Sequence, residues 1–140
     1  MIFVTKLSAA GYRVSSPRRH VYMALESASI PLTPSAVHRV LVSQGKRVGI
    51  ASVYRTLDLL VELELAKVVL QPDGTTGYVA SKDGHNHTIV CQNCHKTYEF
   101  GCCTDLSRLI EQVESETQFL VKDHLLQLYG LCPECQSRNE

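Results

Sequence analysis

The chain has 140 residues, with 14 basic and 14 acidic side chains, 44% hydrophobic residues, six cysteines and six histidines. This length makes one ordinary domain or two small ones, and small lobes commonly need a metal, a disulfide or a partner chain for stability. No stretch approaches the roughly 18–20 uninterrupted apolar residues of a membrane span, and residues 1–6 do not resemble a secretory signal. We therefore expect a cytoplasmic protein, in which closely spaced cysteines act as metal ligands or redox groups rather than disulfides.

The charges are divided unevenly along the chain. Residues 1–57 carry eight basic side chains and one acidic side chain, Glu26, whereas residues 81–140 carry five basic and nine acidic ones. A basic lobe joined to an acidic one suggests that only the first lobe contacts a polyanion. The alternative is a solvated surface whose composition varies by chance.

Three short helices are predicted in the first lobe. Ser16-Pro17 and Thr33-Pro34 are helix start signals that precede apolar residues at helical spacing, and Gly45 ends the second helix. Residues 51–63 predict an amphipathic third helix, whose polar side can donate hydrogen bonds. Its apolar side carries Val53, Leu57, Leu60 and Val61.

Two short strands about a tight turn follow these helices. The strands are predicted at residues 67–70 and 77–80, and the turn at Pro72-Asp-Gly74. Three helices followed by a β-hairpin is the order of a winged helix-turn-helix, which places its last helix in the DNA major groove. Residues 1–80 therefore predict a DNA-binding domain, and residues 81–84 a short polar hinge.

Residues 85–140 predict a small β–β–α–β lobe. Strands are expected at residues 88–91 and 96–100, a helix at residues 105–118, and a third strand-like run at residues 119–131. A lobe of about 55 residues buries too little apolar surface to be stable without further support.

Two C-x-x-C motifs, Cys91-Gln-Asn-Cys94 and Cys132-Pro-Glu-Cys135, flank this lobe. A C-x-x-C turn directs two thiolates at one point, and two such turns complete the closed tetrahedral sulfur site of structural Zn²⁺. The 37 residues between the motifs suffice for strand, helix and strand, so the metal would join the two ends of the lobe. The alternative is a thioredoxin-like redox motif, but one pair would suffice for it and no βαβ frame surrounds either.

A second group of metal-ligating side chains lies in the same lobe. His85 and His87 share one face of an extended segment, because side chains at i and i+2 point the same way. Any four members of the group could form a mixed nitrogen and sulfur site, which favours Zn²⁺ over Mn²⁺ or Mg²⁺. The group consists of His85, His87, Glu99, Cys102, Cys103 and His124.

Four segments lie in order along nearly the whole chain: Gly11-Tyr-Arg-Val with Pro17-Arg-Arg, Ser52-Val-Tyr-Arg-Thr-Leu57, residues 85–94 and residues 124–135. Together they resemble the ferric uptake regulator family of bacterial metal-dependent repressors. The resemblance implies an α+β fold, with an N-terminal winged helix-turn-helix DNA-binding domain and a small β–β–α–β dimerisation domain (residues 85–140) that holds a structural zinc. It also implies a homodimeric repressor on a palindromic operator, not an enzyme.

The resemblance implies roles for single residues. Tyr54 and Arg55 would lie on the recognition helix, with Ser52 near a phosphate. The DNA backbone or minor groove would be contacted by Tyr12, Arg13, Arg18 and Arg19. The structural zinc would be held by Cys91, Cys94, Cys132 and Cys135. A regulatory metal would be held by His85, His87, Cys103 and His124, with Glu99 as a substitute ligand.

The chain departs from the family pattern at the site that usually joins the two domains. Iron- and peroxide-sensing members have a histidine where this chain has Pro31, and a carboxylate near Tyr78 or Val79. Zinc-sensing members often have ligands at the positions of Lys67 and Ala80. That site therefore lacks ligands from the DNA-binding side, which leaves the site inside the dimerisation domain.

A sulfur-containing site with few carboxylates favours a regulator that responds to Zn²⁺ and controls metal uptake. The alternative within the family is an iron- or peroxide-responsive regulator. Two other classes are a zinc nucleobase deaminase, for which His85-Asn-His87 lacks the glutamate of a His-x-Glu motif, and a thiol switch at Cys102-Cys103.

Overall fold

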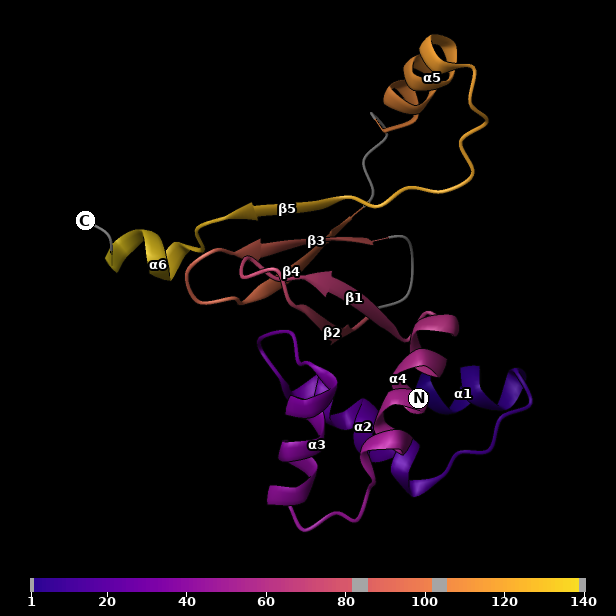
Figure 1. Ribbon diagram of the computed structural model, residues 1–140, viewed down its shortest axis with the longest axis vertical. Helices are drawn as coiled ribbons and strands as arrows, with labels where there is room; N and C mark the ends of the chain where they lie inside the picture. Colours follow the sequence, from indigo (N-terminus) through magenta and orange to yellow (C-terminus); the bar gives the residue numbers. More distant parts are fainter. Residues whose placement is uncertain (1, 82–85, 102–105, 139–140) are drawn as a thin grey trace.

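The computed structural model of the protein describes residues 2–81, 86–101 and 106–138 (Figure 1). We call residues 2–81 the head and residues 86–138 the tail. The head contains α1 (Ile2–Ala9), α2 (Ser16–Ser27), α3 (Pro34–Ser43), α4 (Ile50–Glu62), β1 (Ala66–Leu70) and β2 (Thr76–Ala80). The tail contains β3 (Asn86–Cys91), β4 (Thr97–Gly101), α5 (Leu106–Thr117), β5 (Gln127–Gly130) and α6 (Pro133–Arg138). The α+β fold class is confirmed.

Hydroxyl caps fix the starts of α2 and α3. The Oγ1 atom of Thr33 accepts a hydrogen bond from the N–H of Ala36 at 3.1 Å, as the start signal predicted. The cap of α2 was predicted one residue too late. Ser15, in extended conformation, accepts from the N–H of Arg18 at 3.4 Å, so Pro17 lies inside the first turn.

One hydrophobic core holds the helices of the head together. On the predicted apolar side of α4, Val53, Leu57 and Leu60 are fully buried and Val61 is partly buried. Helix α1 was not predicted, although Phe3 and Leu7 have the i, i+4 spacing of a helix face. Both are fully buried, and the ring of Phe3 stacks on that of Tyr22 in α2, with ring centroids 4.7 Å apart.

Strands β1 and β2 form the predicted antiparallel hairpin, which we call the wing. In its turn the N–H of Gln71 donates to the carbonyl of Thr75 at 2.8 Å, and Gly74 has a φ of 89°. The carboxylate of Asp73 accepts from the hydroxyl of Thr75 at 2.6 Å and from its N–H at 3.0 Å. These bonds lower the pKa of Asp73, so the turn is held by a carboxylate that is ionised at neutral pH.

The tail is built on a three-stranded sheet in the order β4-β3-β5, in which β3 is antiparallel to β4 and parallel to β5. Helix α5 projects away from this sheet (Figure 1), and none of its residues is buried. Helix α6, which was not predicted, begins within the second C-x-x-C motif. Among the described residues, no helix combines the length and apolar character needed to cross a membrane.

The third strand of the tail is shorter than predicted. Only residues 127–130 pair as a strand, whereas residues 119–126 have no regular structure. Side chains of α5 accept hydrogen bonds from backbone N–H groups of this run. The N–H of Phe119 donates to the hydroxyl of Thr117 at 3.3 Å, and that of Val121 donates to the carboxylate of Glu114 at 3.0 Å. Hydrophobicity alone therefore misidentified this run, because its donors are satisfied outside the sheet.

Candidate metal centre and nucleic-acid interface

The four cysteines of the C-x-x-C motifs converge on one point of the tail. The Sγ atoms of Cys91, Cys94, Cys132 and Cys135 all lie within 4.8 Å of one another, and none of the four forms a disulfide. Cys94 Sγ and Cys132 Sγ are 3.7 Å apart. In a tetrahedral site with Zn–S bonds of about 2.3 Å, sulfur atoms lie about 3.8 Å apart. The geometry therefore fits a four-coordinate metal held by sulfur alone.

Backbone hydrogen bonds bring the two motifs together. The first motif begins at the last residue of β3, and its turn is closed by the N–H of His95, which donates to the carbonyl of Cys91 at 3.0 Å. His95 has a φ of 66°, the left-handed conformation that ends this turn. The N–H of Gln92 donates to the carbonyl of Gly130 at 2.8 Å, which ties the first motif to the strand before the second. An ion pair of Lys96 with Glu134 at 2.8 Å adds a further link.

The thiols differ in how readily they lose a proton. The backbone N–H groups of Cys94 and Cys132 point at Cys91 and lower its pKa to about 5. The N–H of Lys96 acts in the same direction on Cys94, but burial and the three neighbouring thiols outweigh it and raise the pKa of Cys94 to about 11. Four close sulfurs cannot all ionise unless a cation lies between them, so the site is suited to a divalent metal.

These cysteines are also the hydrophobic core of the tail. The buried cluster there consists of Cys91, Cys132 and Cys135, with Cys94 packed against it. Most of the large apolar side chains of the tail are instead exposed, including Phe119 and Leu125, which are 73% and 87% exposed. A bound metal would therefore supply the cohesion that apolar packing does not give.

Two histidines of the second predicted group come together. His87 on β3 is buried, and its ring centroid lies 5.5 Å from that of His124, which precedes β5. Both line a cavity of about 640 Å³ that Asp123 and Glu64 also line. Sequence reasoning missed these two carboxylates, and the only local signal was that Asp123 directly precedes His124. His85 and Cys103 lie outside the described residues.

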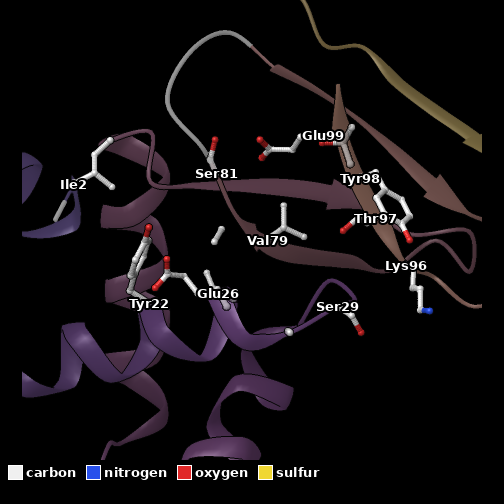
Figure 2. Close-up of a pocket in the computed structure, with 14 residues that line it drawn as sticks. Ile2, Tyr22, Glu26, Ser29, Val79, Ser81, Lys96, Thr97, Tyr98 and Glu99 are labelled. Carbon is white, nitrogen blue, oxygen red and sulfur yellow. The ribbon is translucent and has the colours of Figure 1, made fainter. Parts of the chain in front are cut away.

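Glu99 lies on the other face of the tail sheet. Residues paired across antiparallel strands share a face, so Glu99 lies with Thr88, whereas His87 lies with Phe100. Glu99 lines a different cavity, of about 720 Å³, between α2, β2 and β4, which Glu26 and Ser81 also line (Figure 2). No histidine or cysteine is among the described residues around it. The structure therefore separates Glu99 from the histidine pair.

Three basic residues of the head lie around the starts of α2 and α4. Arg13, Arg18 and Arg55 line one cavity of about 430 Å³, together with the hydroxyl-bearing Ser15 and Ser52. Three guanidinium groups and two helix N-termini form a surface suited to a phosphate group.

The residues expected to contact DNA differ in how they are held. The guanidinium of Arg18 donates to the carbonyl of Arg13 at 2.7 Å and lies 5.5 Å from the ring centroid of Tyr12. Arg55 donates to the hydroxyl of Ser52 at 3.3 Å, on the exposed face of α4. On the same helix Tyr54 is 49% exposed. Arg19 is half-buried on α2.

Comparison with known proteins agrees with this geometry. Residues 9–129 match the sequence model of the ferric uptake regulator family. The chain belongs to the ferric uptake regulator family. Its members are metal-responsive transcription regulators that bind DNA. A family relative, the ferric uptake regulation protein of Legionella pneumophila, is 32% identical over 139 residues, which cover 94% of this chain and 96% of the relative.

Solved structures extend the family likeness to the fold. The ferric uptake regulator of Francisella tularensis with iron is similar at a TM-score of 0.66 and 26% identity, with 90% of this chain and 96% of that chain covered. A zinc uptake regulator complexed with zinc and DNA is similar at a TM-score of 0.77 and 17% identity, with 95% and 89% covered. Both likenesses extend over the head and the tail, so the fold of this chain is that of these regulators.

Proposed function

We propose that this family member is a homodimeric repressor that binds a palindromic operator when Zn²⁺ occupies a second, regulatory site, and so controls metal uptake in the cytoplasm. Cys91, Cys94, Cys132 and Cys135 would hold a structural Zn²⁺. The regulatory ion would be bound by His87 and His124 together with His85 and Cys103.

The sensing part of the proposal depends on the short distance between the rings of His87 and His124. Imidazole rings 5.5 Å apart can bind one ion after a small side-chain rotation, because each Zn–N bond is about 2.0–2.1 Å long. Glu99, which was expected as a substitute ligand, lies on the opposite face of the sheet, whereas Asp123 and Glu64 line the same cavity as the two histidines. With His85 and Cys103 as its further ligands, the ion would have a nitrogen and sulfur site, which is suited to Zn²⁺.

The exposed apolar surface of the tail supports the homodimer. Helix α5 has an apolar stripe that no part of its own described chain buries, and it includes Leu109 and Val113, which are 55% and 38% exposed. Surfaces of this kind mark interaction sites. A second copy would present the same stripe, as twofold symmetry requires.

The decisive test is operator binding as a function of zinc. The probe is a duplex selected from a random pool by the zinc-loaded protein, and the sample is purified under reducing conditions. We expect two Zn²⁺ per chain, loss of duplex binding when a mild chelator removes one of them, and recovery on zinc titration.

The variant His124→Ala separates the two metals. It should keep one Zn²⁺ and the dimer but lose the zinc dependence of duplex binding. Equal binding by the one-zinc and two-zinc forms of the wild type would overturn the zinc response. Recovery with Fe²⁺ but not with Zn²⁺ would instead identify an iron-responsive regulator.

A further inference from the structure

The outer edge of the wing carries two backbone groups that point toward the tail. Leu70 pairs with Thr76, and the next pair, Gln71 with Thr75, is the one that is hydrogen-bonded across the hairpin. Because hydrogen-bonded and non-hydrogen-bonded pairs alternate, the N–H and carbonyl of Leu70 point away from β2. Such edge groups need partners outside the hairpin.

Gln127 and Tyr129 of β5 supply these partners. The amide of Gln127 accepts from the N–H of Leu70 at 3.2 Å and donates to its carbonyl at 2.6 Å. The hydroxyl of Tyr129 donates to the same carbonyl at 2.7 Å and accepts from the Gln127 amide at 2.8 Å. The amide therefore pairs with Leu70 as a neighbouring strand would. We call these four bonds the clasp.

A second contact also joins the wing to the tail. The Nδ1 atom of His95 lies 3.2 Å from Oε1 of Gln71, the residue after Leu70. His95 is held in place by the turn of the first C-x-x-C motif. The base of the wing turn is thus fixed at two points, one on β5 and one beside the cysteine site.

The strand that carries the clasp also leads to the histidine pair. Gln127 is paired with Thr88, the residue after His87, and it lies three residues beyond His124. It also lines the same cavity as the two histidines. The wing is therefore bonded to the very strand that a metal at this cavity would order.

We propose that Gln127 and Tyr129 are positioning residues for DNA binding, which hold the wing, and with it the head, on the tail sheet by direct hydrogen bonds. This proposal rests on the proposed function of the head. The clasp sets the spacing of the two heads in a dimer, which the operator half-sites must match.

The experiment compares Gln127→Leu, Gln127→Glu and Tyr129→Phe in the zinc-loaded full chain. Leucine removes the amide, whereas glutamate keeps the acceptor for the N–H of Leu70 and places a second oxygen against its carbonyl. Each change should weaken binding to the selected duplex by about three- to tenfold, with the largest loss in Gln127→Glu. Deuterium exchange of the peptide covering residues 66–70 should speed up by a similar factor.

The control is Tyr98→Phe on β4, at the opposite edge of the sheet, where the side chain is 55% exposed. It should alter neither duplex affinity nor exchange. Zinc content and dimer mass should stay at wild-type values in all four variants, which separates positioning from loss of structure. Unchanged exchange and affinity in Gln127→Leu would overturn the clasp. If the wild type bound no duplex, the proposed function would fail, whereas exchange in Gln127→Leu would still decide whether the clasp exists.

Discussion

Arg18 and Arg55 line the same cavity, but their surroundings suit them to different parts of a duplex. Arg18 is held against the carbonyl of Arg13 and the ring of Tyr12, so its charge is fixed at one place. A fixed charge beside a helix start is suited to a backbone phosphate. Arg55 lies on the exposed face of α4 and donates a hydrogen bond to Ser52, so its guanidinium can reach a base edge.

We predict that Arg55→Ala weakens binding to the operator by about 1–3 kcal/mol and leaves binding to a scrambled duplex nearly unchanged. Arg18→Ala should weaken both duplexes to a similar degree and reduce the salt dependence of binding. Fluorescence anisotropy with the two duplexes over a range of salt concentrations measures both effects. Equal losses on the two duplexes for Arg55→Ala would contradict its role in reading bases.

The unequal thiols predict how the structural metal is taken up. At pH 7 Cys91, with its pKa lowered to about 5, is already ionised, whereas Cys94, with its pKa raised to about 11, still holds its proton. Zn²⁺ must therefore displace a proton from Cys94. For each displaced proton the apparent affinity should rise about tenfold per pH unit, as long as the pH stays below the pKa of that thiol.

Calorimetry of zinc binding in buffers of different ionisation enthalpy counts these protons. The count at pH 7 should fall by about one in Cys94→Ser relative to the wild type, if the remaining three sulfurs still bind the ion. A competing chelator of known pH dependence gives the affinity from pH 6 to pH 8. An affinity that does not change with pH over this range would contradict the prediction.

At the scale of elements, the wing depends on one glycine. A Cβ atom at Gly77 in β2 would lie 2.6 Å from Cβ of Pro31 and 3.2 Å from its carbonyl carbon. Pro31 is buried, and the next residue, Leu32, is bridged to Tyr78 by backbone bonds of 2.8 and 3.0 Å. The loop before α3 therefore packs against β2 at a distance that only glycine allows.

Gly77→Ala should destabilise the head by about 1–3 kcal/mol, because either the loop or β2 must move to make room. Urea unfolding followed by circular dichroism measures this change. Gly101→Ala is the matched control, because Gly101 also lies in a strand, a Cβ atom there has no neighbour within 4 Å, and Gly101 does not have a positive φ. An unfolding midpoint for Gly77→Ala equal to that of Gly101→Ala would show that the contact is not tight.

Elements that carry local signals were predicted, and those without them were missed. The Thr33-Pro34 start, the apolar side of α4 and the wing turn follow from residues close in sequence. Helix α1 has the right spacing, but it is short and lacks a start signal. The strand expected at residues 119–126 does not form, because side chains of α5 accept hydrogen bonds from N–H groups of this run. Only the tertiary structure creates these contacts.

At the scale of the molecule, cysteine spacing predicted the sulfur cluster because few chemistries need two C-x-x-C motifs. The separation of Glu99 from His87 could not be predicted, because it depends on which residue of β4 faces which residue of β3. The clasp could not be predicted either, since Leu70 and Gln127 are 57 residues apart and the bonds use backbone atoms. Sequence patterns therefore indicated which residues could bind a metal, and strand register decided which of them meet.

The exposed stripe of α5 predicts how two copies of the chain assemble. In a dimer built on this stripe, Leu109→Glu would bury an unpaired carboxylate, and such burial costs several kcal/mol. The dimer dissociation constant should rise by at least about a hundredfold. Ser115→Glu adds the same charge on the opposite side of α5 and should leave the dimer intact. Sedimentation equilibrium of the zinc-loaded proteins distinguishes the two, and a Leu109→Glu protein that dimerised like the wild type would place the interface elsewhere.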